Sequence, residues 1–433
     1  MYSIVEAKNL ISEGKLDDAF SRLYDKQKIS IEQQKNRYLE AIDSFEEVFP
    51  NHSDITLFSA PGRTEVGGNH TDHQRGIVLA AAVNLDVIAV FALNESRTIR
   101  IQSKGFPMDV VDIDHLEIHE EETGHSASLL RGIVARIKEL GYQIGGFDAY
   151  TTSNVLKGSG LSSSAAFENL VGTMISHQFN NGAISAVDIA KISQYAEVHY
   201  FGKTCGLMDQ MVSSVGGFVS IDFKDTEKPA IEKIDFDFAD CGYSLCIVDT
   251  KGNHSDLTAD YVAIPTEMKQ VAAFFGKEVL REVDEETFYQ NISNVREKTS
   301  DRAILRAIHF FKDNQTALDE ATALKNHDFE TFKNLIRSSG NSSFKFLQNI
   351  YSNSNPAEQG VALGLAISEH ILKDRGVCRV HGGGFAGTIQ SFVPVDLVST
   401  YQDAIEQVFG AGSCYVLNIR PIGGTVVAES CNG

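Results

Sequence analysis

The stretch from Gly158 to Ala166 combines residue types that bind phosphate. It reads GSGLSSSAA, so two glycines allow a close backbone approach and three serines stand where a helix is expected to begin. Backbone N–H groups and the positive end of the helix dipole would then face one ligand. The spacing matches neither the GxxxxGKS/T phosphate loop nor the dinucleotide GxGxxG motif. A turn followed by serine capping of a helix explains the same residues without a ligand.

A second polar cluster lies in the segment from Ala60 to Gly76, which reads APGRTEVGGNHTDHQRG. Arg63 supplies several hydrogen-bond donors, and a histidine close to an aspartate, such as His70 and Asp72, suits sugar hydroxyls. His70, Asp72 and His73 are also possible ligands of a metal ion. A polar surface loop is the plain alternative to both kinds of site.

A third segment, Arg379 to Gly387, reads RVHGGGFAG and follows an expected strand. Its four glycines suit close packing of the backbone against a ligand or another loop. Glycine-rich turns are common, so this segment indicates little by itself.

Composition and charge limit the ligands and the location of the chain. Among 433 residues, 38 Lys and Arg stand against 58 Asp and Glu, a formal net charge of −20. Such a surface repels nucleic acid and anionic membranes, so a phosphate must be held locally. The six cysteines include no CxxC pair, which predicts free thiols. The sequence shows no signal peptide and no apolar run of membrane length, which predicts a cytoplasmic protein.

The elements that would position these motifs alternate along the chain. Residues 1–50 carry apolar residues at helical spacing and predict two or three helices that pack on the main body, with a regulatory or oligomerisation role as the alternative. Strands alternate with helices from residue 55 to about residue 250, and a charged helical stretch runs from about residue 259 to 341. Strands return near the end. This pattern and length predict a mixed α+β protein with two lobes.

In this order the three segments resemble the motifs of the GHMP kinases, and within them the galactokinases. APGR followed by HTD looks like the galactokinase signature, GSGLSSSAA like the phosphate loop and GGGFAG like the third motif. A fourth stretch, AEVHYFGKTCGLMDQ, resembles the galactokinase segment with the catalytic aspartate, here Asp209. The resemblance runs from about Tyr38 to the C-terminus. It implies the two-domain GHMP kinase fold, with an active site between an N-terminal domain (residues 51–240) and a C-terminal domain (residues 241–433), after a helical extension (residues 1–50).

The resemblance also implies roles for individual residues. Arg63 and Asp209 would be catalytic and lie at the anomeric hydroxyl of the sugar. The sugar-binding residues that it implies are Asn69, His70, Asp72, Gly206 and Tyr261. The nucleotide-binding residues are Gly158, Ser159, Gly160, Leu161, Ser162, Ser163 and Ser164. A magnesium ion would be held by Ser164 and Glu197, because this ion prefers oxygen ligands.

These roles predict an ATP-dependent kinase that phosphorylates galactose at O1. The cofactor would be Mg²⁺, and the ligands would be the sugar and ATP, without nucleic-acid or membrane partners. A non-catalytic sugar and ATP sensor is an alternative, although the retention of Arg63, Glu197 and Asp209 argues against it.

Three positions depart from the galactokinase pattern. Galactokinases usually read GRVNLIGEHTDY where Gly62 to His73 reads GRTEVGGNHTDH, so Asn69 replaces a glutamate that lies near O6 of the sugar. Leu156 replaces a proline, and His381 replaces a threonine. The neutral Asn69 removes a repulsion against a carboxylate at C6, which leaves a galacturonate or N-acetylhexosamine kinase open as an alternative.

Overall fold

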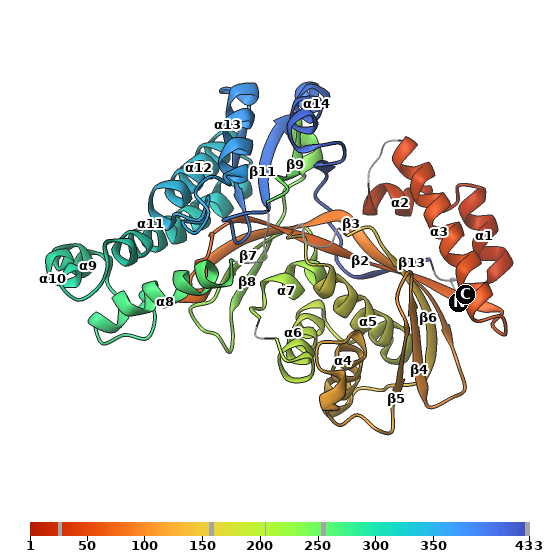
Figure 1. Ribbon diagram of the computed structural model, residues 1–433. Helices are drawn as coiled ribbons and strands as arrows, with labels where there is room; N and C mark the ends of the chain where they lie inside the picture. Colours follow the sequence, from red (N-terminus) through yellow and green to blue (C-terminus); the bar gives the residue numbers. More distant parts are fainter. Residues whose placement is uncertain (25–27, 156–159, 204, 253–256, 429–433) are drawn as a thin grey trace.

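The structure is a computed structural model of residues 1–433. It describes the chain except for residues 25–27, 156–159, 204, 253–256 and 429–433 (Figure 1).

The first lobe is built on a nine-stranded, mostly antiparallel sheet with the order β1-β2-β3-β6-β4-β5, in which β13 also pairs with β2, and β7 pairs with β3 and β8. Only β4 and β6 pair in parallel within the described sheet. The strands are β1 (Tyr2–Ser3), β2 (Asp54–Gly67), β3 (Ile77–Leu93), β4 (Thr98–Ser103), β5 (Met108–Asp112), β6 (Phe147–Ser153), β7 (Phe218–Asp222), β8 (Ala230–Ile234) and β13 (Thr425–Ala428).

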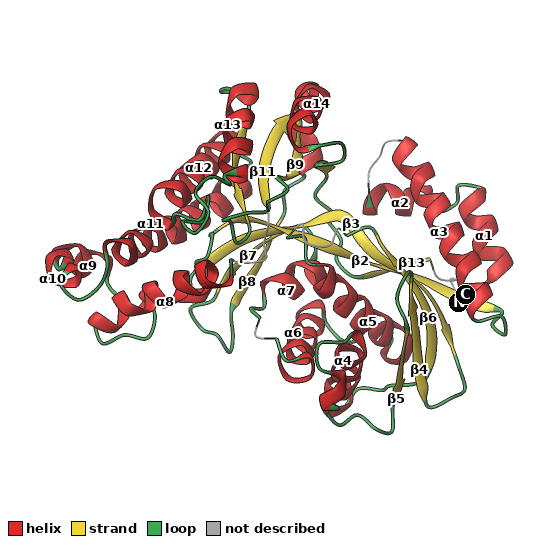
Figure 2. Cartoon of the chain, in the orientation of Figure 1, coloured by secondary structure: helices red, strands yellow, loops and turns green. Residues whose placement is uncertain are grey.

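Helices cover both faces of this sheet, which explains why β3 is a continuous apolar run. Val87, Ala89 and Phe91 point into the core shared with α4 (Ser126–Glu139), α5 (Ser163–Asn180) and α6 (Ala186–Ala196). The alternate residues, Ile88 and Val90, pack in the cluster formed by the N-terminal helices. Figure 2 shows the two groups of helices on opposite sides of the strands. The short helix α7 (Met208–Val215) follows a π turn, η3 (Glu197–Phe201).

The N-terminal extension forms three helices, α1 (Ile4–Ser12), α2 (Asp17–Leu23) and α3 (Lys28–Val48), as its spacing predicts. An ionic cluster fixes them to the main body. The buried carboxylate of Asp86 on β3 accepts from Arg37 of α3 at 2.5 Å and from Tyr24 at 2.6 Å. Arg420, near the end of the chain, donates to the same carboxylate at 3.2 Å. The prediction that the extension packs on the main body is confirmed.

The second lobe has a four-stranded antiparallel sheet with the order β10-β11-β9-β12. Its strands are β9 (Tyr243–Asp249), β10 (Val377–His381), β11 (Thr388–Pro394) and β12 (Cys414–Leu417). Its helices are α8 (Thr258–Phe274), α9 (Glu285–Gln290), α10 (Ile292–Arg296), α11 (Asp301–Lys325), α12 (Phe329–Ser342), α13 (Gly360–Leu372) and α14 (Val398–Phe409). After this lobe the chain returns to the first lobe, where β13 pairs with β2 (Figure 1). The last strand of the chain therefore belongs to the first sheet.

The architecture agrees with the predicted mixed α+β protein with two lobes. Five cysteines are free thiols, Cys205, Cys241, Cys246, Cys378 and Cys414, whereas Cys431 lies outside the described residues. Of the helices in the described ranges, none combines the length and the apolar run that a membrane crossing requires.

Candidate active site

The centre of the site is an ion pair that joins two elements. Arg63 lies on β2, and Asp209 lies in the first turn of α7. Nε of Arg63 donates to Oδ1 of Asp209 at 2.7 Å, and Nη2 reaches the same oxygen at 2.7 Å. The Asp209 side chain is 33% exposed and that of Arg63 is 11% exposed, so a ligand can still reach the carboxylate.

The phosphate loop closes around this ion pair. Ser162 precedes α5 in the left-handed conformation, with a φ of 55°, and its hydroxyl donates to Oδ2 of Asp209. Nη1 of Arg63 donates to the carbonyl of Gly160, and the backbone N–H of Arg63 donates to the carbonyl of Leu161 at 3.0 Å. The structure thus brings Arg63, Asp209 and the phosphate loop together. Two predicted residues of the loop lie outside the described residues, Gly158 and Ser159.

A cavity of about 430 Å³ begins at the N-terminus of α5. Ser163 and Ser164, which open this helix, line it together with Lys104, Phe106 and Phe201. The positive end of the helix dipole and a lysine therefore border a space of the size that small ligands occupy. The sequence motifs gave no signal for Lys104 or Phe106, because both residues lie in a loop after β4 that is distant in sequence from all of the motifs.

The HTD turn lies against the glycine loop of the third motif. His70 adopts a φ of 60°, and its Nε2 donates to the carbonyl of Gly383 at 3.0 Å. Burial lowers the pKa of His70 to about 4, so its imidazole is neutral at pH 7. The hydroxyl of Tyr261, on α8, donates to the carbonyl of Gly384 at 3.0 Å. A Cβ on Gly383 would lie only 2.5 Å from the Tyr261 ring, so glycine is needed for this contact.

Asp72 follows in the same turn, in the short helix η1 (Asp72–Gln74). Its side chain is 25% exposed. A Cβ on Gly206 would lie 3.6 Å from Oδ2 of Asp72, so the glycine stands directly beside the carboxylate. The predicted sugar residues His70, Asp72, Gly206 and Tyr261 therefore gather around one region, where the two lobes meet.

Asn69 lies elsewhere than the resemblance implies, because it is completely buried. Its Nδ2 donates to Oε1 of Glu65 at 2.9 Å and to the carbonyl of Gly382 at 2.8 Å. Its Oδ1 accepts from Nδ2 of Asn349 at 2.8 Å and from the hydroxyl of Ser343 at 3.3 Å. These contacts use every polar atom of the side chain, which leaves none for a sugar.

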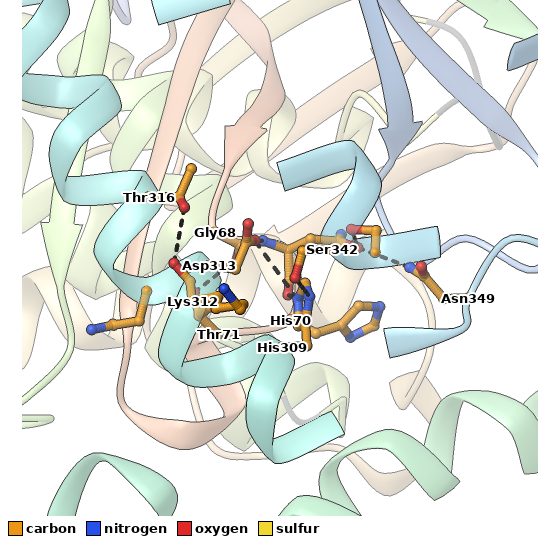
Figure 3. A network of polar contacts seen from close by, with 12 residues as sticks. Gly68, His70, Thr71, His309, Lys312, Asp313, Thr316, Ser342 and Asn349 are labelled. Atoms are coloured by element: carbon orange, nitrogen blue, oxygen red, sulfur yellow. Dashed lines mark hydrogen bonds and ion pairs between the residues drawn. The ribbon is translucent and has the colours of Figure 1, made fainter. Parts of the chain in front are cut away.

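The backbone of Asn69 is held equally firmly by α11. Its N–H donates to Oδ2 of Asp313 at 2.8 Å, and its carbonyl accepts from Nε2 of His309 at 2.8 Å. Nδ1 of His309 in turn accepts from the hydroxyl of Ser342 at 2.9 Å. Figure 3 shows His309, Asp313, Ser342 and Asn349 gathered around the turn that contains His70.

Glu197 lies close to Asp209, in the π turn η3, and it is 3% exposed. Its Oε1 accepts from Nζ of Lys203 at 2.8 Å, and its Oε2 accepts from Nε2 of Gln210 at 2.6 Å. The same Nε2 donates to Oε2 of buried Glu168 at 3.1 Å, whereas Oε1 of Glu168 has no partner within the described chain. Burial, together with the charge of Glu197, raises the pKa of Glu168 well above its usual value.

Over the ranges that the structure describes, no three His, Cys, Asp or Glu side chains are grouped so as to hold a metal ion. The alternative that His70, Asp72 and His73 bind a metal therefore finds no support. Nε2 of His70 is used by the carbonyl of Gly383, and His73 is 48% exposed at the surface. Magnesium binding by Ser164 and Glu197 stays a prediction.

Two family models match the segments that form this site. The galactokinase galactose-binding signature matches residues 43–93, which include Arg63 and the HTD turn. The GHMP kinase N-terminal domain matches residues 128–217, which include the phosphate loop and Asp209. These two matches indicate a galactokinase-like sugar kinase.

Solved structures show the same fold. The galactokinase of Lactococcus lactis in complex with galactose aligns with a TM-score of 0.74 at 24% identity, over 90% of this chain and 99% of that chain. The mevalonate kinase of Methanococcus jannaschii aligns with a TM-score of 0.60 at 15% identity, over 84% of this chain and 98% of that chain. The phosphomevalonate kinase of Streptococcus pneumoniae gives a TM-score of 0.57 at 11% identity, over 86% and 99% of the two chains.

In this galactokinase-like kinase, the unusual His381 joins the third motif to the phosphate loop. Its Nδ1 lies 2.8 Å from Oγ1 of Thr388, and its Nε2 lies 3.0 Å from Oγ1 of Thr64. A Cβ on Gly160 would lie 3.2 Å from the imidazole. Burial lowers the pKa of His381 to about 3, which keeps the ring neutral. The histidine therefore packs beneath the phosphate loop as an uncharged group.

Proposed function

We propose that this kinase transfers the terminal phosphoryl group of ATP to O1 of galactose, giving α-galactose 1-phosphate and ADP. The observation that carries this proposal is the Arg63–Asp209 ion pair, which Ser162 joins to the phosphate loop. The pair lies where the segment matched by the galactose-binding signature meets the loop that opens α5.

The two charged groups have complementary tasks in this reaction. Oδ1 and Oδ2 of Asp209 accept the hydrogen bond of the O1 hydroxyl, which increases the electron density on the attacking oxygen. Arg63 lies 2.7 Å from the same carboxylate and stabilises negative charge on O1 and on the transferred phosphoryl group. The Ser162 hydroxyl, which donates to Oδ2, keeps the carboxylate turned toward the reacting centre.

The nucleotide enters the cavity beside Ser163 and Ser164 in this proposal. The positive end of the α5 dipole and the ammonium of Lys104 attract the phosphates, which matters in a protein with a net charge of −20. Apolar side chains of Phe106 and Phe201 line the same cavity and suit the flat base.

The donor atoms around Glu197 suit Mg²⁺. Ser164 and Glu197 would hold the ion with a hydroxyl and a carboxylate oxygen, and water would complete its shell. Buried Glu168, whose Oε1 has no partner in the described chain, is joined to Glu197 through Nε2 of Gln210. Lys203 and Gln210 now donate to the two oxygens of Glu197, so an ion bound by this carboxylate would displace one of these donors or share an oxygen with it. When bound, the ion neutralises charge on the nucleotide phosphates.

Galacturonate loses its support as a substrate, because the side chain of Asn69 does not reach the cleft. The replacement of the usual glutamate by Asn69 therefore does not make room for a carboxylate at C6 of the sugar. Galactose is the substrate that the matched signature favours.

The direct experiment measures ADP release by the purified chain with Mg²⁺ and ATP. Galactose, galacturonate, N-acetylgalactosamine and glucose are compared at equal concentrations, with Asp209→Asn as the inactive control. We expect galactose to give the highest kcat/KM. A higher value for another sugar, or equal ADP release with and without sugar, contradicts the proposal.

A further inference from the structure

Glu65 lies in the sugar motif at a position to which the motif comparison gives no role. It is on β2, two residues after Arg63, and these residues pair regularly with Ala80 to Ala82 of β3. Side chains alternate between the two sides of a strand, so Glu65 and Arg63 point to the same side. The Glu65 carboxyl accordingly feels the charges of both Arg63 and Asp72.

One oxygen of Glu65 is anchored and the other is not. Oε1 accepts from Nδ2 of Asn69 at 2.9 Å and from Nη2 of Arg379 at 3.2 Å. Oε2 forms no hydrogen bond to the described chain, and it is not one of the fully buried atoms there that lack a partner. The Glu65 side chain keeps 11% of its surface exposed, whereas Asn69 has none. Oε2 is therefore the atom of this pair that a ligand can reach.

We propose that Glu65, and not Asn69, supplies the carboxyl group that accepts a hydrogen bond from a sugar hydroxyl. Asn69 positions the Glu65 side chain. The inference rests on the proposed function, since it requires a sugar between Arg63, Asp72 and Tyr261. Arg379 and Asn69 fix the orientation of the Glu65 carboxyl through Oε1, and Oε2 accepts the hydroxyl of the sugar.

The sequence difference from galactokinases agrees with this assignment. Those enzymes usually read GRVNLIGEHTDY, with an amide where this chain has Glu65 and a carboxylate where it has Asn69. The chain thus keeps one carboxylate and one amide in the motif but exchanges their positions. The two side chains are joined by a hydrogen bond of 2.9 Å. An amide and a carboxylate can form such a bond whichever of the two positions each occupies.

The test pairs one variant with a series of sugars. Glu65→Gln keeps the shape of the side chain and an Oε1 that accepts from Asn69, so the variant is expected to fold. Wild type and variant are assayed with galactose and with its 2-, 3-, 4- and 6-deoxy analogues, and galactose affinity is measured by calorimetry without ATP. Glu297→Gln, an exposed glutamate on the second lobe, is the matched control.

We expect wild type to disfavour one analogue by on the order of 10- to 100-fold in kcat/KM, because that sugar leaves Oε2 of Glu65 unpaired. Glu65→Gln should reduce this preference to less than about 3-fold and leave the other preferences unchanged. A uniform loss with all five sugars, or no change, overturns the assignment. If wild type phosphorylates no sugar, the proposed function and the inference fail together.

A second variant tests the exchange of positions. Glu65→Asn combined with Asn69→Glu restores the order of the galactokinase motif. We expect the double variant to bind galactose within about 10-fold of wild type, whereas Asn69→Glu alone loses at least 100-fold. Equal losses in the single and double variants would show that the two residues are not coupled and would overturn the positioning role of Asn69.

Discussion

Arg63 Nε and Asp209 Oδ1 lie 2.7 Å apart, although 146 positions separate the two residues in the chain. The approach of β2 to the phosphate loop makes this possible. A Cβ on Gly62 would lie 2.7 Å from the carbonyl of Leu161, so a larger residue there would push the strand away. The small residue before Arg63 therefore serves the geometry of the ion pair, and the charged groups serve the reaction.

Removing either charge of this pair should stop turnover without unfolding the protein. We expect Asp209→Asn and Arg63→Ala to lower kcat by about 10² to 10³, because each group acts on charge that develops in the transition state. Steady-state kinetics and thermal midpoints of both variants check this. Asp403→Asn, an exposed aspartate on α14, is the control for the loss of one charge. A kcat within about threefold of wild type would remove these residues from the catalytic centre.

Asn69→Glu should destabilise the fold, even though it restores the residue usual in galactokinases. The new carboxylate would place an oxygen against Oε1 of Glu65 and the carbonyl of Gly382, which now accept from Nδ2. Two buried acceptors would lose their donor and a charge would be buried, at a cost of about 3 to 5 kcal/mol. Urea unfolding at pH 7.5 measures it, with the exposed Asn341→Glu as control. An unchanged midpoint would mean that the network around Asn69 is not formed.

Glu65 should make stability depend on pH. Burial raises its pKa to about 7, against the lowering effect of Arg379, Asn69 and Arg63, while the charge of Asp72 raises it further. The folded chain holds this proton more tightly than the unfolded chain, so its contribution to stability is full at low pH and is lost as pH rises through about 7.

The isoelectric point near 5.1 restricts the measurement to higher pH. Between pH 6 and pH 8.5 wild type should lose about 1.4 kcal/mol of unfolding free energy relative to Glu65→Gln, since one pKa unit corresponds to about 1.36 kcal/mol. Denaturant unfolding at both pH values gives the difference. The raised pKa is contradicted if the difference in unfolding free energy between wild type and Glu65→Gln is the same at both pH values, or if it shifts in favour of wild type at the higher pH.

The sequence predicted the elements well where one physical rule governs them. Gly14 follows α1 and Gly141 follows α4, and both adopt the positive φ that commonly lets a glycine end a helix. The burial of Asn69 was not predictable, because its six partners include Asp313, Asn349 and Gly382, which lie in segments more than 240 positions away. The motifs identify segments that the structure brings together, but the packing of α11 on the turn is needed to show that the Asn69 side chain is fully used.

Glu197→Gln should weaken the use of metal and nucleotide together while sugar affinity stays nearly constant. The carboxylate accepts hydrogen bonds from Lys203 and Gln210, and none of its hydrogen bonds in the described chain involves the HTD turn. Loss of its charge should raise the half-saturating Mg²⁺ concentration by about 10-fold, the usual scale for a lost ligand-sphere interaction. Titration of Mg²⁺ at fixed ATP measures the change, and Mn²⁺ binding followed by electron paramagnetic resonance gives a readout that does not need turnover.

The control is Glu297→Gln, and galactose affinity is measured in parallel by calorimetry. Equal metal affinity in variant and wild type would exclude Glu197 from the metal site, whereas a loss of galactose affinity of similar size would place it nearer to the sugar.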